Sequence, residues 1–509
     1  MEGAFARSVG RWGAFACLIA VVSATGNARA IPADIDHLLV LVFDQMRPDY
    51  VDRFNLQHFK QLRAESRHYP AAYVGHLGSQ TVVSHLVIPT GLLPRELPWQ
   101  ENVMVDARGV LGTAGAVYDT GRLTREQYWT LLAALPSRTF LPARLREKTG
   151  QKVIAIGEKD YATTLLGTPA ADAIVTLAKT GGTCRPAGVN VPAYITDNPR
   201  FTLGCSATYG TGSSTIYALD GDRYVPGNDP LKQGGDVWTT DAALEVMSRE
   251  RWSGLLLTFG GIDKVGHMLG EQDGEGLRSV STPFRLADIA RVADAQLGRL
   301  LAELRKRQLL DRTLIVVTAD HGAQRNEVYL GNNRYQSCCG FENNNTAVDP
   351  PYWIDHLRQL GRLKTTYQDT SVKVWLADTS RENESVVLSG MTDIPGMTEV
   401  FALQSTAVTR QYKQVWSNLA NQSQAFQRWA KAHHEELVNT MAADGAPHLI
   451  GLLADGYGFG RIGDHGGAQE RVQRIPLMIR VPGEGGSTRR ESMRLVDISR
   501  EVTALMNLK

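Results

Sequence analysis

Short, uninterrupted apolar runs recur along the chain and predict the strands of a sheet. They lie at residues 37–43, 152–156, 255–259 and 313–318. None alternates apolar with polar residues, which is typical of strands buried on both faces of a parallel sheet. Residues 284–306 instead keep apolar positions at a 3.6-residue spacing, as in a helix packed on such a sheet. The pattern predicts an α/β fold: a three-layer sandwich with a mostly parallel central sheet and helices on both faces.

The alternation of strands and helices breaks between residues 326 and 445. This stretch is polar, with a β-like patch at 371–377 and a helix near 417–443. We interpret 326–445 as an inserted cap region and expect its His433 and His434 to be solvent-exposed. Residues 31–325 and 446–509 are then expected to form one main domain.

The first thirty residues predict a secretory signal peptide. Arg7 and Arg11 precede a short apolar stretch at 12–22, and Ala28-Arg29-Ala30 supplies a cleavage site. No other stretch reaches the roughly 18 apolar residues of a membrane-spanning helix. We expect a periplasmic or secreted mature chain that begins near Ile31, without a stable membrane anchor. An uncleaved N-terminal anchor is the alternative.

Charge bears on the expected partners of the protein, and cysteine content bears on its expected disulfides. The formal net charge is +1, which gives no reason to expect nucleic acid as a general partner. Cys184 and Cys205 bracket a loop rich in glycine, proline and asparagine, and in an exported protein they are the natural disulfide pair. Cys338 and Cys339 are adjacent and form either a vicinal disulfide or a thiol pair. The sequence leaves the oligomeric state open.

Residues suited to metal binding follow the predicted strands. In parallel sheets the carboxyl ends of strands share one edge, so these side chains are expected to converge. Carboxylate and imidazole groups together suit zinc. Each residue also has a structural alternative, such as a helix cap for Asp44 or a surface pair for Asp263 and His267. The candidates are Asp44, Asp263, His267, Asp320, His321 and His465.

Thr81 opens a short apolar segment at 82–88 that predicts a helix. A hydroxyl at a helix N-terminus lies among free backbone N–H groups that favour an anion, which suits an alcohol that attacks phosphorus. The alternative is an N-cap. His85, one turn further on, is expected to pack against the site or support it rather than react.

Five short motifs contain these candidate residues. They are D-Q-M-R-P-D-Y at 44–50, T-V-V-S-H at 81–85, D-K-V-G-H at 263–267, A-D-H-G at 319–322 and D-H-G-G at 464–467. Together and in this order they resemble the alkaline phosphatase superfamily, in the branch that contains the nucleotide pyrophosphatase/phosphodiesterases and the threonine-dependent periplasmic alkaline phosphatases. The resemblance runs from about residue 37 to 326 and resumes at 446–504.

The resemblance implies a two-metal hydrolase of a small phosphoester substrate, with two divalent ions, preferably zinc. One ion would be bound by Asp263, His267 and His465. The other would be bound by Asp44, Asp320 and His321, and also by Thr81, which would be the nucleophile of a phospho-threonine intermediate. Two further catalytic residues are expected: Asn102, which would contact a phosphoryl oxygen, and Lys159.

The sequence leaves the substrate open between monoesters and diesters. In the phosphatase group a K-D-R segment binds the terminal phosphate oxygens, whereas this chain has Lys159 but Tyr161 in place of the arginine. A phenol serves a phosphate dianion less well than a bidentate guanidinium does. Two other classes of protein remain as alternatives. A sulfatase of this fold needs a cysteine or serine nucleophile within a C/S-x-P-x-R motif, which no stretch near Thr81 supplies. A non-catalytic exported binding protein would be expected to lack a ligand or the nucleophile.

Overall fold

The computed structural model describes most of the chain. The described residues are 35–180, 183–204, 235–269, 286–330, 346–347, 357–406, 409–459 and 463–509. The predicted signal peptide, Cys205, Cys338 and Cys339 lie outside them, and Cys184 is disulfide-bonded. Within these ranges, no helix is long and apolar enough to cross a bilayer.

A ten-stranded sheet forms the centre of the fold, in the order β22-β2-β21-β10-β1-β9-β5-β6-β7-β8. Its five middle strands are parallel, and β21 (Leu477–Arg480) and β7 (Thr183–Val189) pair antiparallel at their flanks. The parallel strands are β10 (Thr313–Thr318), β1 (His37–Phe43), β9 (Trp252–Phe259), β5 (Lys152–Gly157) and β6 (Ala173–Thr180).

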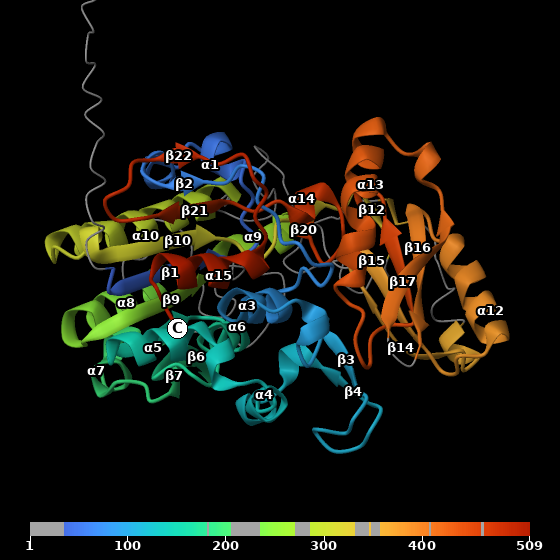
Figure 1. Ribbon diagram of the computed structural model, residues 1–509, viewed down its shortest axis with the longest axis horizontal. Helices are drawn as coiled ribbons and strands as arrows, with labels where there is room; N and C mark the ends of the chain where they lie inside the picture. The colour runs from blue at the N-terminus through green and yellow to red at the C-terminus, as the bar shows by residue number, and fades with distance from the viewer. Residues whose placement is uncertain are drawn as a thin grey trace, which may run out of the picture. The chain divides into compact units, whose positions relative to one another are not determined.

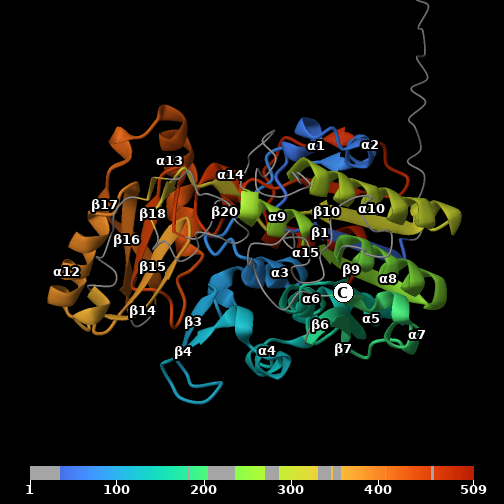
Figure 2. The same ribbon diagram turned by 180° about the vertical axis from the view of Figure 1, so that it is seen from behind.

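Helices cover both faces of this sheet, as Figures 1 and 2 show from opposite sides. Every residue of β1, β9 and β10 is therefore buried, which explains their unbroken apolar character. The predicted three-layer α/β fold is confirmed. One face carries α2 (Gln57–Ala64), α8 (Gly235–Arg249), α9 (Gly261–Leu269) and α10 (Leu286–Lys306); the other carries α3 (Thr81–Thr90), α5 (Leu141–Thr149), α6 (Asp160–Gly167) and α15 (Leu495–Leu505).

The register of the parallel strands brings their carboxyl ends level. Phe43 pairs with Phe259, and Val42 pairs with Thr318. Asp44, Gly260 and Ala319 therefore follow their strands at the same edge of the sheet. This is the edge at which ligand sites of parallel sheets form.

A second, antiparallel sheet occupies the predicted cap region and its C-terminal flank. β18 lies beyond the boundary predicted at residue 445 but pairs with β15 and β16, so it completes this sheet. The expectation of an exposed His434 is wrong, because His434 is buried and pairs with Glu399. The sheet contains β14 (Leu363–Gln368), β15 (Ser371–Leu376), β18 (Leu449–Leu453), β16 (Met397–Ser405) and β17 (Arg410–Ser417), flanked by α12 (Arg381–Thr392) and α13 (Gln424–Asn439). We call it the inserted sheet.

Short elements complete the described chain. They are α1 (Tyr50–Arg53), β2 (Arg67–His68), β3 (Val103–Asp106), β4 (Ala116–Asp119), α4 (Arg125–Leu132), α7 (Ala193–Thr196), β8 (Leu203–Gly204), β11 (Gln324–Arg325), β12 (Val328–Tyr329), β13 (Thr346–Ala347), β19 (Tyr457–Gly458), β20 (Gly463–Asp464), α14 (Glu470–Gln473) and β22 (Ser487–Thr488). The pairing of β11 with β20 matters most for function, because it brings the segment that contains His465 close to the end of β10.

Candidate active site

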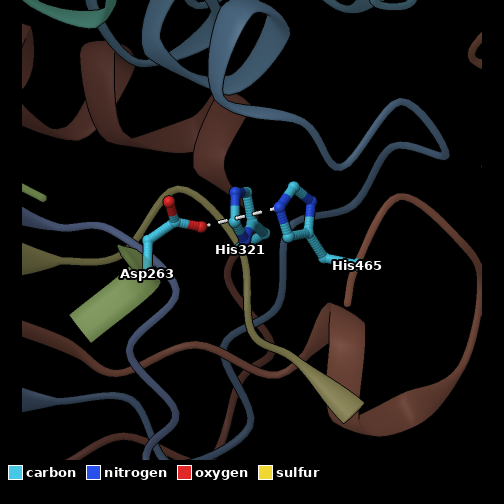
Figure 3. Close-up of side chains that lie close together, drawn as sticks. All are labelled: Asp263, His321 and His465. Carbon is cyan, nitrogen blue, oxygen red and sulfur yellow. Dashed lines mark ion pairs between the residues drawn. The ribbon is translucent and has the colours of Figure 1, made fainter. Parts of the chain in front are cut away.

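Two imidazoles and a carboxylate from distant parts of the chain meet at the carboxyl edge of the sheet. Figure 3 shows the Asp263 carboxylate, from the first turn of α9, pointing toward the rings of His321 and His465. The two rings stack with their centroids 3.6 Å apart. All three side chains are buried, so the chain places charged and polar groups where water reaches them poorly.

A first cluster forms around the end of β1 and β10. The Nε2 atom of His321 lies 3.5 Å from Asp44 Oδ1 and 3.2 Å from Asp320 Oδ2. Asp320 Oδ1 accepts hydrogen bonds from the backbone N–H groups of Gln45 and His321, which leaves Oδ2 facing the cluster. Asp44, Asp320 and His321 together have the geometry of a metal site.

A second cluster adjoins the first and shares His321 with it. Asp263 Oδ1 lies 3.1 Å from His267 Nε2 and 3.6 Å from His465 Nε2. The two Nε2 atoms of His267 and His465 are 3.2 Å apart. Asp263, His321 and His465 could hold one ion, and Asp464 joins His267 and His465 in a further group. The clusters contain the six aspartates and histidines that were predicted as metal ligands, and Asp464 is an addition that its place in D-H-G-G could have suggested.

The three imidazoles are oriented by backbone carbonyls. His267 Nδ1 lies 2.7 Å from Gly463 O, and His465 Nδ1 lies 3.1 Å from Ser79 O. His321 Nδ1 lies 3.1 Å from Gly322 O. Because a carbonyl can only accept, each Nδ1 must carry the proton and donate it. In the neutral rings Nε2 then keeps a free lone pair, which is the arrangement of metal-binding histidines.

Unsatisfied oxygens show that these residues fit a bound cation. Asp44 Oδ1, Asp263 Oδ1 and Asp320 Oδ2 are buried and accept no hydrogen bond of good geometry from the described residues. Each faces an imidazole Nε2 lone pair instead. Buried lone pairs that face one another are unfavourable unless a positive charge lies between them. The donor set therefore suits two divalent ions.

The electrostatics of the clusters agree with this fit. Burial, and next the charge of Asp44, raise the pKa of Asp320 well above its usual range. Burial also lowers the pKa of His321 and, more strongly, that of His465. For Asp263 burial acts to raise the pKa, but His267 and Lys159 outweigh it and hold the pKa well below normal. His321 and His465 are thus kept neutral and ready to act as ligands.

Lys159, at the end of β5, lies between the two clusters. Its ammonium donates to Asp44 Oδ2 at 2.6 Å and to Asp263 Oδ2 at 2.5 Å. Burial acts to lower the pKa of Lys159, but Asp263 and Asp44 together raise it well above its usual value. The predicted catalytic lysine therefore lies at the site, as a fixed positive charge shared by two carboxylates.

Thr81 is the first residue of α3, and its hydroxyl faces the first cluster. Gln80, not Thr81, occupies the N-cap position, so the alternative of a threonine cap is wrong. Thr81 Oγ1 lies 3.4 Å from His321 Nε2. His85, one turn on, lies 3.0 Å from Thr81 O and 2.8 Å from Thr258 Oγ1 through its two ring nitrogens. Burial lowers the pKa of His85 to about 4, so it supports the site as a neutral residue.

Asn102 lies beside the residue that precedes the predicted nucleophile. Its amide Nδ2 donates to Gln80 Oε1 at 3.0 Å and to the Tyr367 hydroxyl at 2.7 Å. The structure thus places Asn102 next to the start of α3, in contact with the inserted sheet. Tyr367 had no signal in the sequence, since β14 follows no recognisable motif.

Comparisons with known proteins agree with the fold and the site. The family model for type I phosphodiesterase / nucleotide pyrophosphatase matches residues 38–336, more than half of the chain. A search of curated protein sequences found no match.

Solved structures share the fold at low sequence identity. Wild-type alkaline phosphatase PafA matches with a TM-score of 0.60 and 14% identity, over 94% of this chain and 96% of its own. An inactive variant of murine ectonucleotide pyrophosphatase / phosphodiesterase 5 in complex with AMP matches with a TM-score of 0.54 and 12% identity, over 93% and 96%. The human protein gives 0.53 and 13%, over 93% and 95%.

The structural matches establish the alkaline phosphatase fold, with its mixed, mostly parallel sheet and a separate antiparallel insert. The family model reaches from β1 past the A-D-H-G motif and so includes most of the predicted site. The protein therefore belongs to the type I phosphodiesterase / nucleotide pyrophosphatase family of hydrolases, within the alkaline phosphatase superfamily.

Proposed function

We propose that this protein is an exported phosphoester hydrolase that uses Thr81 as its nucleophile at a two-zinc site. One observation carries the proposal. Two buried carboxylate–imidazole clusters share His321, and the Thr81 hydroxyl lies 3.4 Å from the Nε2 atom of that histidine. A hydroxyl and two cation sites in this arrangement suit an in-line displacement at phosphorus.

Thr81 Oγ1 attacks the phosphorus atom and displaces the leaving alcohol, which gives a phospho-threonine. Water then displaces Thr81 and releases the product. Thr81 is well placed for this step because it begins α3, where the helix N-terminus favours an anion. When bound, the two zinc ions supply Lewis-acid charge that favours the ionised hydroxyl and the departing oxygen.

Zinc is the metal that the donors favour. Each predicted site combines histidine nitrogen with aspartate oxygen, and nitrogen-containing sets of this kind suit zinc, whereas magnesium and calcium prefer oxygen alone. The threonine at the helix start, together with the family match, supports phosphoester rather than sulfate ester chemistry. Membership in a hydrolase family argues against the non-catalytic alternative.

We further propose that phosphate diesters are better substrates than monoesters. A diester bears one negative charge at phosphorus and a monoester dianion bears two, so a monoester needs more positive charge nearby. Lys159 shares its charge between Asp44 and Asp263, and position 161 carries tyrosine where an arginine would bind the extra charge.

A pair of test esters decides the preference. We expect the zinc-loaded protein to have a higher kcat/KM for bis-p-nitrophenyl phosphate than for p-nitrophenyl phosphate. Tyr161→Arg should shift the ratio of the two values toward the monoester by about tenfold, because a bidentate guanidinium favours the dianion. Tyr161→Phe is the matched control, since it removes the phenol without adding charge. A wild-type monoester preference that Tyr161→Arg leaves unchanged would contradict this assignment.

Export is the remaining part of the proposal. The arginines, apolar stretch and A-x-A site of residues 1–30 support a cleaved signal peptide. The mature protein, purified from the periplasm or the medium, is then expected to start near Ile31, which its intact mass would show. A mass that includes residues 1–30 would favour the uncleaved anchor.

A further inference from the structure

A buried lysine on the inserted sheet joins three segments that build the site. Lys373, on β15, has no exposed surface, and its ammonium lies 2.8 Å from both Asp369 Oδ2 and Glu101 Oε2. It also donates to the carbonyl of Gly466 at 2.7 Å. Asp369 and Glu101 are buried as well. We call Lys373, Asp369 and Glu101 the Lys373 cluster.

Each partner of this cluster is next to a residue of the proposed active site. Gly466 follows His465 in the chain. Asp369 Oδ2 accepts a hydrogen bond from Gln80 Nε2 at 2.6 Å, and Gln80 precedes Thr81. The cluster therefore holds the flanks of the metal-ligand segment and of the nucleophile.

The same cluster reaches the third segment through Glu101. Glu101 Oε1 accepts a hydrogen bond from the backbone N–H of Asn102 at 2.8 Å. Buried charges thus join the inserted sheet to the three segments that contain Thr81, Asn102 and His465.

Tyr367 adds a direct contact to Asn102. Its hydroxyl accepts one N–H of the Asn102 amide, and Gln80 Oε1 accepts the other, so the rotation of that amide is fixed. Burial, and next the charge of Asp369, raise the pKa of Tyr367 well above its usual value, which keeps the phenol neutral. The Lys373 ammonium also lies over the Tyr367 ring, 5.5 Å from its centroid.

We propose a positioning role for one part of the inserted sheet: Tyr367 and the Lys373 cluster hold Asn102, Gln80 and the His465 segment in place around Thr81. This inference rests on the proposed function, because it assigns these residues to the same reaction. Tyr367 sets the direction of the Asn102 amide, whose N–H groups can then be shared with a phosphoryl oxygen at Thr81.

Tyr367→Phe is the informative variant. Removal of Lys373 would leave two buried carboxylates without a counter-ion and would destabilise the fold, whereas Tyr367→Phe removes one oxygen atom. The matched control is Tyr412→Phe. Tyr412 lies in β17 of the same sheet, is fully buried, and donates its hydroxyl to Pro447 O at 2.6 Å. Both variants lose one hydrogen bond of a tyrosine hydroxyl, but of the two only Tyr367 contacts the active-site segments.

The test measures kcat and KM for bis-p-nitrophenyl phosphate, and the affinity for orthovanadate, with full-length zinc-loaded protein. We expect Tyr367→Phe to lower kcat about tenfold with little change in KM, because a single hydrogen bond is of that size. Vanadate, which mimics the five-coordinate transition state, should bind more weakly by a similar factor. Tyr412→Phe should match the wild type in both measurements. Equal behaviour of the two variants would overturn the inference.

An Asn102→Ala background shows whether Tyr367 acts through Asn102. If it does, Tyr367→Phe has no further effect on kcat in that background, whereas two independent effects would multiply; multiplication would contradict the positioning role. A wild-type protein without turnover would refute the proposed function instead. The inference would then be decided by vanadate affinity alone, and a value weakened by Tyr367→Phe but not by Tyr412→Phe would support it.

Discussion

Thr81→Ala is expected to lower kcat for phosphoester hydrolysis by at least about a thousandfold. The substitution removes the only atom that can form the phospho-threonine, and the loss of a covalent nucleophile costs far more than the loss of a binding contact. The fold should be little affected, because Thr81 lies at the start of α3 and does not serve as its cap. Steady-state kinetics and thermal unfolding of the zinc-loaded variant check both parts of this prediction.

Two variants separate the hydroxyl from its surroundings. Thr81→Ser keeps an attacking oxygen and should retain measurable turnover. Thr90→Ala removes a buried hydroxyl at the other end of the same helix, where Thr90 Oγ1 donates to Leu86 O at 2.6 Å, and should leave kcat near the wild-type value. Turnover by Thr81→Ala within about tenfold of wild type would show that another group is the nucleophile.

Removal of bound metal should abolish turnover, and added zinc should restore it. The reason is the set of carboxylate oxygens that face imidazole lone pairs without a hydrogen-bond donor, at Asp44, Asp263 and Asp320. We expect about two zinc ions per chain by elemental analysis. His321→Ala should reduce this content and the activity together, because His321 belongs to both clusters. His448→Ala changes a histidine outside both clusters and is the control, which should leave the zinc content and the activity unchanged.

Acid should release the metal. In the metal-free protein the pKa of Asp320 is raised, so Asp320 keeps its proton at pH values where an exposed aspartate has lost it. Metal binding must expel this proton, and affinity therefore rises with pH and falls as the solution becomes acidic. Titration calorimetry in buffers of different ionisation enthalpy measures the released protons. Full activity after exhaustive chelation, or zinc affinity that is unchanged on acidification, would contradict the two-metal site.

The ligand-bearing edge of the sheet could be predicted because buried parallel strands are recognisable from short apolar runs in the sequence. Asp44 and Asp320 directly follow apolar runs, and parallel strands in register must bring those ends together. Asp263 and His267 are four residues apart on α9, so helical spacing alone joins them. His465 directly follows β20, which lies outside the central sheet, and its placement beside His321 depends on the pairing of β20 with β11.

Within the predicted cap region, local pattern predicted only one strand of the inserted sheet, β15, as the β-like patch at 371–377. Its residues S-V-K-V alternate polar with apolar, which is typical of a strand with one face toward solvent, yet every residue of β15 is buried, including Lys373. A lysine in a polar stretch is expected to be solvent-exposed. The partners that bury Lys373 are Glu101 and Gly466, which are far away in the chain. The expected exposure of His434 is wrong for the same reason, since its burial depends on Glu399 of β16. These positions are decided by tertiary contacts that no short window contains.

Phosphoryl trapping on Thr81 tests the central claim most directly. Zinc-loaded protein is mixed with bis-p-nitrophenyl phosphate, quenched in acid within a turnover, digested and analysed by tandem mass spectrometry. One p-nitrophenolate leaves when Thr81 attacks the diester, so we predict one p-nitrophenyl phosphoryl adduct on the peptide that contains Thr81, located at that residue and absent from Thr81→Ala. Turnover without any adduct, together with full activity of Thr81→Ala, would show that the reaction does not pass through this threonine.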